Sequence, residues 1–263
     1  MAGDRACIHT APQRTLRTRV STDPDLMALY QHFQDGVPWY LARHYWWAYL
    51  WKRSIWFFDH QPIINAILFG HYRKLQAMTL PHVTTEPTHR VLQLTCVYGE
   101  LTGKLLQRLP QGMFIVDACT AQMQLAQTRT ASIGHPLHCV RLNAESLSFA
   151  DNSFDQIIVF FLFHEMPHDA RERSIAEIAR VLRPGGSIIL SEYAPLPEQH
   201  LLYRFPLTRW ILGRLEPFLP DFWRHDIKVS FDESLHIHGK SIAAESRAYC
   251  FNSFYRVTSF QIK

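Results

Sequence analysis

Four polar residues each follow an apolar run, and each has a side chain that can bind a ligand or react. Asp117 follows MFIV, Asn143 follows CVRL, and His164 and Glu165 follow VFFLF. An acid in this setting can reach ribose hydroxyls, and histidine and glutamate can transfer protons or bind a metal. Each also has an ordinary structural role, since an aspartate after a strand is more often a helix cap. The chemistry therefore depends on whether the fold brings them together.

The stretch RVLQLTCVYGELTGKL, residues 90–105, has the pattern of a strand, a tight turn and the beginning of a helix. In α/β enzymes this turn holds a nucleotide-like cofactor. Gly99 is the position at which the backbone could approach such a ligand closely. The stretch nevertheless lacks most of the glycines of such a turn, so the site is either lost or rebuilt for other chemistry.

Apolar strands alternate with helical segments from residue 90 onward. The expected strands are 91–97, 113–119, 138–145, 154–163 and 187–193, and the expected helices are 101–109, 121–130 and 171–182. This alternation predicts a mostly parallel, doubly wound α/β sheet, whose strand ends bring Asp117, Asn143 and residues 160–165 together. RPGG at 183–186 predicts a glycine stop to the last helix. Two β-rich runs around FNS, within 248–262, predict an antiparallel pair that completes the sheet.

Two segments lie outside this alternation. Residues 24–80 read as helical with breaks at GVP (36–38) and Pro62, and five of the seven tryptophans fall between 39 and 56. This aromatic and basic helix, residues 39–58, suits a membrane surface or a greasy ligand, and equally an aromatic face packed on the core. Residues 195–245, rich in proline and aromatics, predict an insertion over the active site. We therefore divide the chain into a tail (1–23), a helical lid (24–85) and an α/β domain (86–263).

Composition excludes several functional classes. The net charge is +4 and the basic residues are scattered, which argues against a nucleic-acid partner. Five cysteines without CxxC spacing favour a reducing compartment. We find no run of 18 uncharged apolar residues and no secretory signal, so we expect no transmembrane span. Four arginines in the first 19 residues suit an organelle-targeting segment or a floppy tail.

The series VLQLTCVYG, VDAC, NAESLSFADNSFDQIIV and RVLRPGGSIIL resembles the class I S-adenosylmethionine-dependent methyltransferases, particularly the quinone C-methyltransferases, across roughly residues 88–193. The chain is similar, more closely still, to the RquA family of rhodoquinone biosynthesis proteins. This likeness rests on CVYGELT (96–102), FFLFHEMP (160–167) and the flanking HYWWAYLWKRSIWFF, NAILFGHYRKL and LEPFLPDFWRHDI.

The resemblance implies a Rossmann-like fold with a mostly parallel seven-stranded sheet and S-adenosylmethionine as co-substrate. It implies ubiquinone as substrate and rhodoquinone as product, with an amino group from S-adenosylmethionine replacing a ring methoxy group. It also implies a divalent metal, with Mn²⁺ as the expected ion, and peripheral attachment to the cytoplasmic side of the inner membrane, or to the matrix side in a mitochondrion.

The resemblance and the residue chemistry together define the candidate site. The expected cofactor-binding residues are Gln93, Thr95, Cys96, Val97, Gly99, Asp117, Ala118, Asn143, Ala144, Glu145 and Phe161. The expected catalytic residues are Tyr98, His164, Glu165 and His225, and the metal-ligand candidates are Glu100, His164 and Glu165. Adjacent residues of a strand point to opposite sides, so His164 and Glu165 can share a metal only if the strand has already ended.

The turn departs from the methyltransferase pattern at three positions. Gln93 stands where these enzymes have an acid, and Thr95 and Val97 stand where they have glycines. An acid would keep the methionine ammonium protonated and without a lone pair, whereas a neutral glutamine removes that bias. We therefore expect these residues to turn the amino group towards the quinone. The alternatives are a quinone or small-molecule methyltransferase, and an inactive domain of the same fold that serves as a scaffold.

Overall fold

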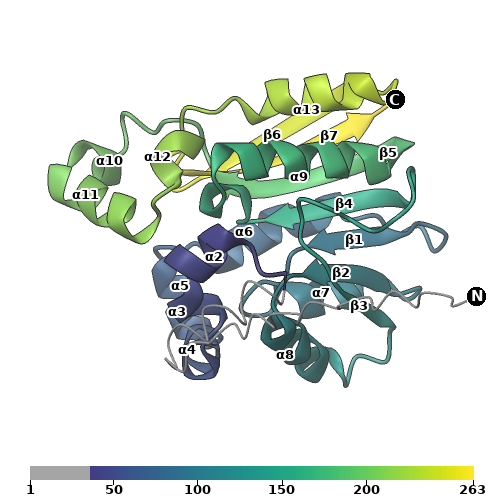
Figure 1. The fold of residues 1–263 in the computed structure, drawn as a ribbon, viewed down its shortest axis with the longest axis horizontal. Coiled ribbons are helices and arrows are strands. Elements are labelled where there is room, and N and C mark those ends of the chain that lie inside the picture. The colour runs from purple at the N-terminus through teal and green to yellow at the C-terminus, as the bar shows by residue number, and fades with distance from the viewer. Residues whose placement is uncertain (1–35) are drawn as a thin grey trace, which may run out of the picture.

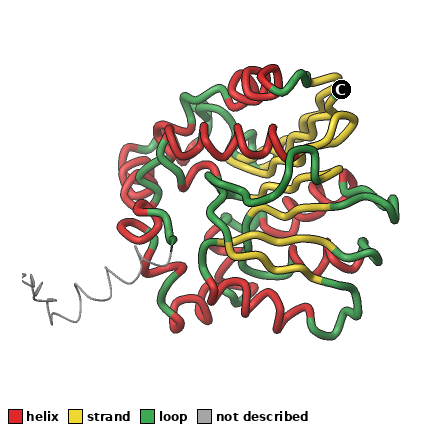
Figure 2. The backbone as a smooth tube through the Cα atoms, turned by 45° about the vertical axis from the view of Figure 1, so that its right-hand side comes forward, coloured by secondary structure: helices red, strands yellow, loops and turns green. Residues whose placement is uncertain are grey.

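The computed structural model describes residues 36–263 (Figure 1). The tail predicted at 1–23 and the beginning of the predicted lid lie outside the described residues. Within them, a central sheet is flanked on both faces by helices (Figure 2).

The sheet has seven strands in the order β3-β2-β1-β4-β5-β7-β6. Their bounds are β1 (Val91–Leu94), β2 (Met113–Asp117), β3 (Leu137–Arg141), β4 (Phe154–Phe160), β5 (Leu182–Tyr193), β6 (Ile242–Cys250) and β7 (Tyr255–Ile262). The first five strands are parallel, and β7 runs antiparallel between β5 and β6. The predicted sheet is confirmed, including the final antiparallel pair around Phe251, Asn252 and Ser253.

Two helical layers enclose the sheet. Helices α6 (Tyr72–Thr79), α7 (Leu101–Gln107) and α8 (Thr120–Thr130) form one layer, and α9 (His168–Val181) and α13 (Ile227–Ile237) pack against each other in the other. Right-handed crossovers require this arrangement, because the chain moves outward from β1 in one direction and from β4 in the other. β1 and β4 are nearly continuous apolar runs because both of their faces are covered.

The role predicted for RPGG is wrong. Helix α9 already ends at Val181, and β5 begins at Leu182, which pairs with Phe154. The next pair is Gln156 with Ser187, so RPGG bulges out between two ladder contacts. A Cβ on Gly186 would lie 2.8 Å from the Asp155 carbonyl oxygen. Close approach of two strands, and not a helix stop, therefore requires this glycine.

The segment predicted as one insertion, 195–245, has two parts. Helices α10 (Leu201–Arg204), α11 (Pro206–Leu215) and α12 (Leu219–Phe222) follow β5, and α10 and α11 project from the body at the left of Figure 1. In contrast, α13 covers the sheet beside α9, and β6 already begins at Ile242. The element that projects from the sheet is therefore confined to the first part of the predicted insertion.

The helix predicted at 39–58 is three short helices, α2 (Trp39–His44), α3 (Trp46–Tyr49) and α4 (Lys52–Phe58), which α5 (Gln61–Ile67) follows. Tyr45 and Trp51 leave the helical conformation and separate the three. The break expected at Pro62 is confirmed, since Pro62 lies in the first turn of α5. None of the helices within residues 36–263 has the length and apolarity to span a bilayer.

Candidate functional site

A cavity lies between the carboxyl ends of the strands and the N-terminal helices. Its strand side is formed by loops after β1, β2, β3 and β4 and by the end of β5. Its other side is formed mainly by aromatic and aliphatic side chains of α2 to α5. This is where an open parallel sheet binds its ligands, because the loops diverge on either side of β1 and β4.

Most of the residues predicted from the sequence meet in this cavity. Those that line it are Thr95, Cys96, Val97, Tyr98, Asp117, Ala118, Asn143, Ala144, Phe161, His164 and Glu165. Those that do not line it are Gln93, Gly99, Glu100, Glu145 and His225. The convergence expected of the four strand ends is therefore observed, and the exceptions each have a local cause.

Asp117 joins the ends of β1 and β2. One carboxylate oxygen accepts from the Cys96 backbone N–H at 2.9 Å, and the other accepts from the Cys119 backbone N–H at 2.7 Å. Burial raises the pKa of Asp117 to about 6, although these two donors oppose the shift. Asp117 thus has the structural role of an aspartate that precedes a helix, and it also faces the cavity.

Gln93 and Gly99 lie behind the cavity wall. Gln93 is fully buried, its Nε2 donates to the Thr95 carbonyl at 2.8 Å, and its Oε1 has no partner. A Cβ on Gly99 would lie 2.6 Å from the Tyr72 hydroxyl oxygen, so this glycine accommodates a tyrosine and not the expected ligand. That hydroxyl donates to the Tyr98 carbonyl at 2.8 Å and so helps to fix the turn.

The other three exceptions belong to surface or secondary networks. Glu100 forms an ion pair with Lys104, one helical turn later, and its side chain is half exposed. Glu145 accepts from Arg173 and from the Tyr40 hydroxyl. The third exception, His225, belongs to a separate cluster described below. The structure therefore does not bring Glu100 or His225 to the metal or catalytic positions expected of them.

His164 and Glu165 lie in η2 (Phe163–Glu165), a single 3₁₀ turn, because β4 has ended at Phe160. The condition for the two adjacent side chains to converge is therefore met. His164 Nδ1 lies 2.7 Å from Glu192 Oε1, and His164 Nε2 lies 3.9 Å from Glu216 Oε2. We call His164, Glu165, Glu192 and Glu216 the acidic cluster.

Burial and charge act against each other in the acidic cluster. Burial alone would lower the pKa of His164, but the carboxylates of Glu192, Glu216 and Glu165 raise it to about 9. Burial raises the pKa of Glu165 to about 8 and also raises that of Glu216, although the charge of His164 opposes both shifts. These shifts bring Glu165 within reach of proton exchange near neutral pH and leave His164 protonated there, as in an acid–base site.

Tyrosines from the N-terminal helices close over these carboxylates. The Tyr45 hydroxyl donates to Glu216 at 2.9 Å, and the Tyr49 hydroxyl donates to Glu165. The ring of Tyr49 stacks on that of Tyr98, with centroids 5.7 Å apart. The sequence patterns did not indicate Tyr45, Tyr49, Glu192 and Glu216 as site residues. Their only signal was that they fall within motifs quoted for the resemblance or, for Glu192, near the end of the fifth strand.

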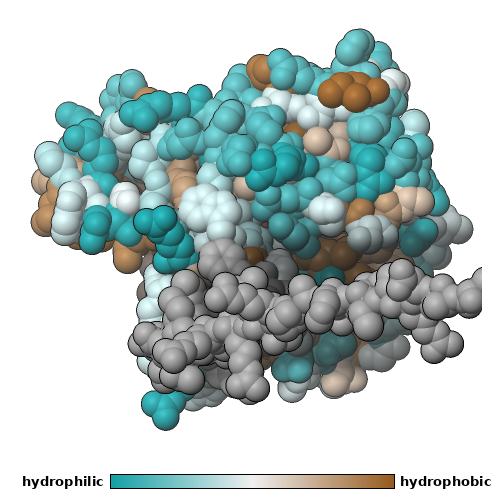
Figure 3. Space-filling model, viewed as in Figure 1, coloured by the Kyte–Doolittle hydropathy of each residue, from teal (hydrophilic) through white to brown (hydrophobic). Residues whose placement is uncertain are grey.

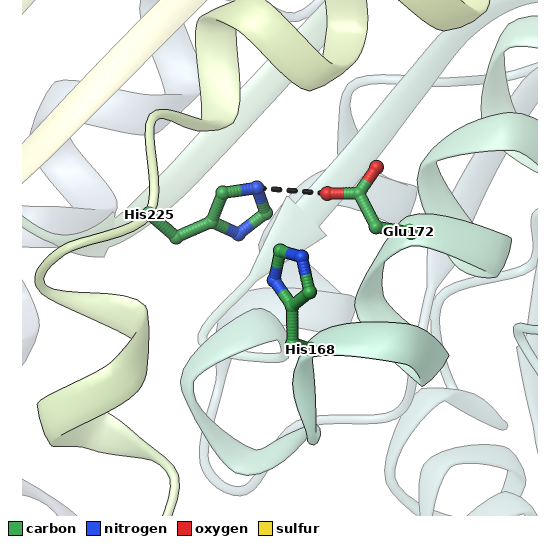
Figure 4. Close-up of side chains that lie close together, drawn as sticks. All are labelled: His168, Glu172 and His225. Atoms are coloured by element: carbon green, nitrogen blue, oxygen red, sulfur yellow. Dashed lines mark ion pairs between the residues drawn. The ribbon is translucent and has the colours of Figure 1, made fainter.

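Two groups of side chains within residues 36–263 have metal-ligand chemistry. His164, Glu165 and Glu216 offer three ligand atoms within 4.8 Å of one another, and so do His168, Glu172 and His225. In the second group, His225 Nε2 lies 2.8 Å from Glu172 Oε1 (Figure 4). His225 Nδ1 lies 2.7 Å from Nη1 of Arg171. Only the first group lines the cavity.

Comparison with known sequences finds a likeness to methyltransferases over part of the chain. Residues 91–186 match the profile of the family described as "Methyltransferase domain" (Methyltransf_25). The chain is 26% identical over 167 residues to the ubiquinone/menaquinone biosynthesis C-methyltransferase UbiE of Cupriavidus taiwanensis. It is 28% identical over 148 residues to UbiE of Bordetella avium. These matches cover 61% and 54% of the chain, and 68% and 57% of the respective relatives.

Solved structures support the fold. A chain from the complex between the Haloferax volcanii Trm112 methyltransferase activator and the putative methyltransferase superposes with a TM-score of 0.56 at 14% identity, covering 78% of this chain and 95% of that one. The [4+2]-cyclase SpnF superposes with a TM-score of 0.50 at 16% identity, covering 72% and 79%. The protein thus has the Rossmann-like class I methyltransferase fold. Because the cyclase SpnF shares this fold, the fold alone does not determine which reaction is catalysed.

Proposed function

We propose that this protein converts ubiquinone to rhodoquinone, with S-adenosylmethionine donating the amino group that replaces a methoxy group on the ring. The observation that carries the proposal is the acidic cluster, which shares one cavity with the loops after β1, β2 and β3. The amine nitrogen bonds to the ring carbon and its proton leaves with the methoxy group as methanol. The bond between that nitrogen and Cα of the methionine moiety then breaks, with a proton moving from Cβ to the ring nitrogen and an alkene left on the methionine fragment. Such a reaction needs buried groups that exchange protons near neutral pH.

The cofactor side of the cavity suits S-adenosylmethionine. Asp117 ends β2 at the cavity, the position from which an acid reaches ribose hydroxyls. Each of its oxygens accepts one backbone N–H and keeps a lone pair for a further donor. Oε1 of Gln93 is a buried acceptor without a partner. A ligand donor that reached it would remove the free-energy cost of leaving this acceptor without a hydrogen bond.

Gln93 does not line the cavity, but it donates to Thr95, which does, and its neutral side chain supports amine transfer over methyl transfer. A carboxylate at this position would hold a nearby ammonium in its charged form, whereas an amide does not. Because a free α-amino group has a pKa of about 7.7 to 8.0, a neutral surrounding leaves a nucleophilic fraction at neutral pH. We expect Gln93→Asp to bind S-adenosylmethionine and to lose amination. Undiminished amination by this variant would contradict the role of Gln93.

A divalent cation such as Mn²⁺ fits His164, Glu165 and Glu216. Imidazole and carboxylate are ligands that Mn²⁺ accepts. Burial raises the pKa of both glutamates, although the charge of His164 opposes the shifts. A bound cation would polarise a quinone carbonyl as a Lewis acid. Whichever of Glu165 and His164 the cation leaves unligated would take up and return protons, and the Tyr45 and Tyr49 hydroxyls would orient the carboxylates.

The test uses purified full-length protein, ubiquinone, Mn²⁺ and S-adenosylmethionine labelled with nitrogen-15 at the amino group. We expect rhodoquinone that carries the label, detected by mass spectrometry. A quinone that gains a methyl group would overturn the proposal. Unlabelled rhodoquinone would overturn the assignment of the nitrogen donor.

A quinone C-methyltransferase is the second candidate, and the similarity to UbiE favours it. In that reaction the sulfonium methyl faces the acceptor, and the product mass separates the two reactions. A non-catalytic scaffold of the same fold is the third candidate. A rise in melting temperature on addition of S-adenosylmethionine would argue against a scaffold that has lost its cofactor site, because a ligand that binds only the folded state stabilises it.

A polyprenyl quinone resides in the bilayer, so we propose that the enzyme works as a peripheral protein on the cytoplasmic side of the inner membrane, or the matrix side in a mitochondrion. The apolar side chains of α2 to α5 that line the cavity would then receive the ring and the first part of its tail. Fractionation of cells that express the full chain, with and without a high-salt wash, would test this location.

A further inference from the structure

Helix α11 turns an apolar stripe towards solvent. Leu207, Trp210, Ile211 and Leu215 follow the i, i+3, i+4, i+8 spacing of one helix face, and their exposed fractions are 66%, 64%, 40% and 52%. A stripe of this kind normally packs on the core, and here only Leu212 is buried. Hydrophobic side chains are visible at the left tip of the protrusion (Figure 3). A contiguous exposed apolar face of this kind marks an interaction surface.

The charges on this protrusion all have one sign. Leu201–Leu215 contains Arg204, Arg209 and Arg214 and no aspartate or glutamate. All three arginines are exposed, and Arg209 lies over the ring of Tyr203. The described side chains form no ion pair with any of the three. The apolar stripe is therefore accompanied by positive charge that the rest of the described chain leaves unneutralised.

We propose that α10 and α11 form a membrane-docking element that inserts its apolar stripe into the interface of a bilayer rich in anionic lipid. Leu201 and Phe205, exposed at 65% and 62%, extend the stripe beyond α11. Tryptophan and leucine on one face with arginine beside them are the composition of helices that lie in the headgroup region. Arginine reaches lipid phosphates while its alkyl stem stays in the apolar layer.

Charge favours a lipid surface over a second copy of this chain. A symmetric contact through α11 would bring the arginines of both copies into one interface, and Leu201–Leu215 supplies no carboxylate to pair with them. The phosphates of an anionic bilayer can pair with all three arginines.

The position of the element relative to the cavity deepens the proposed function. Glu216 follows α11 directly and lines the cavity with Tyr45, to which it is hydrogen-bonded. Docking of α11 would therefore hold the Glu216 side of the cavity near the bilayer, where a substrate with a long apolar tail resides. The purpose of docking rests on the proposed function, but docking itself rests on exposure and charge and can be measured without any substrate.

The experiment is co-sedimentation of the full-length protein with quinone-free vesicles of phosphatidylcholine alone or of phosphatidylcholine with 30% phosphatidylglycerol, roughly the anionic content that attracts basic segments. We expect binding to the anionic vesicles and at least about tenfold weaker binding to the neutral ones. Replacing Leu207, Trp210 and Leu215 by serine, or the three arginines by glutamine, should each lower the partition onto anionic vesicles by about tenfold or more.

The matched control removes three exposed charges elsewhere, with Arg73→Gln, Lys74→Gln and Arg108→Gln on and next to α6 and α7. This control should bind anionic vesicles as the unchanged protein does. All variants should have the same melting temperature as the unchanged protein. Equal binding by the α11 variants and the control would overturn the proposal, as would equal binding to both vesicle types.

A concentration-dependent dimer that the serine variant abolishes, without vesicle binding, would assign the surface to a second copy. Product formation in detergent, measured separately, would show whether the proposed reaction stands.

Discussion

The molecule has two clusters of histidine and glutamate that differ in what surrounds them. In the acidic cluster His164 and Glu192 are buried and Glu165 and Glu216 are half-buried, and the ion pairs among the described side chains give its three carboxylates no lysine or arginine partner. The second cluster, His168, Glu172 and His225, is partly exposed and touches the buried guanidinium of Arg171 (Figure 4). Similar residue types therefore have opposite electrostatic surroundings.

The two imidazoles respond in opposite directions. Burial lowers the pKa of His225 and the charge of Arg171 lowers it further, whereas in His164 the carboxylates outweigh burial and raise the pKa to about 9. His225 is also saturated, because Arg171 donates to Nδ1 and its Nε2 lies 2.7 Å from Ser230 Oγ. In the second cluster the Arg171 guanidinium balances the glutamate, so the cluster has a structural role. In the acidic cluster no lysine or arginine balances the carboxylates, so a cation or a proton can bind there.

Arg171 also connects the two clusters. Its Nε and Nη2 donate to the carbonyls of Phe163 and Met166, at 3.0 and 2.9 Å, and these residues flank His164 and Glu165. The second cluster therefore stabilises the turn that carries the first.

The largest effect should come from Glu216→Gln. We expect product formation to fall by about 100-fold or more, because the change removes a proposed metal ligand and a charge that sets the protonation of His164. Mn²⁺ binding, followed by the loss of the free-ion electron paramagnetic resonance signal, should weaken in the same variant. Glu172→Gln is the matched control from the second cluster, and it should keep most of both. Equal losses in the two variants would remove the functional distinction between the clusters.

The next largest effect is on stability. Arg171→Met leaves two carbonyls and His225 without a buried donor, so the free energy of unfolding should fall by about 3 to 5 kcal/mol. Urea denaturation measures this difference. Arg173→Met removes an arginine two residues away that is half exposed, and should cost at most about 1 kcal/mol. If Arg171→Met lowered the free energy of unfolding only slightly, the hydrogen bonds of Arg171 would not be what stabilises the turn that carries His164 and Glu165.

The two histidines should titrate apart in metal-free protein. Nuclear magnetic resonance of the imidazoles should give a pKa of about 9 for His164 and one below the ordinary value of 6.5 for His225. Protonated His164 should therefore stabilise the fold below about pH 6.5, and this stabilisation should be lost as the pH rises through about 9. His225 should act in the opposite sense and destabilise the fold as the pH falls below 6.5. Coincident titrations would contradict the comparison.

The smallest effect should come from Tyr49→Phe. The Tyr49 hydroxyl lowers the pKa of Glu165, so its removal should raise that pKa further above about 8. The limb of the pH–rate profile that reports ionisation of Glu165 should move to higher pH by about one unit or less. Tyr203→Phe, on a ring that packs against Trp223, should leave the profile where it is. A shift to lower pH in Tyr49→Phe would mean that the hydroxyl favours protonated Glu165.

The half of the site that the strand ends form could be predicted from the sequence, because a single rule about parallel sheets places its residues. Parallel strands end at the same edge of a sheet, so Asp117, Asn143 and Phe161 had to converge once the alternation was recognised. Gly99 shows the limit of the rule. Its place in the turn was predicted correctly, but the group that its missing side chain accommodates is Tyr72, from a helix 27 residues earlier.

The sequence by itself determined the sheet, the order of the helices, the strand ends and the end of β4 as a reactive position, because hydrophobic periodicity and chain direction are local properties. Only the tertiary structure decided which carboxylates surround His164. Glu192 and Glu216 come from the end of β5 and the end of α11, and Tyr45 and Tyr49 come from the N-terminal helices. The structure likewise decided that His225 pairs with Arg171 and that the stripe of α11 faces outward. Charge and exposure are set by neighbours that are distant in sequence, and no local pattern contains them.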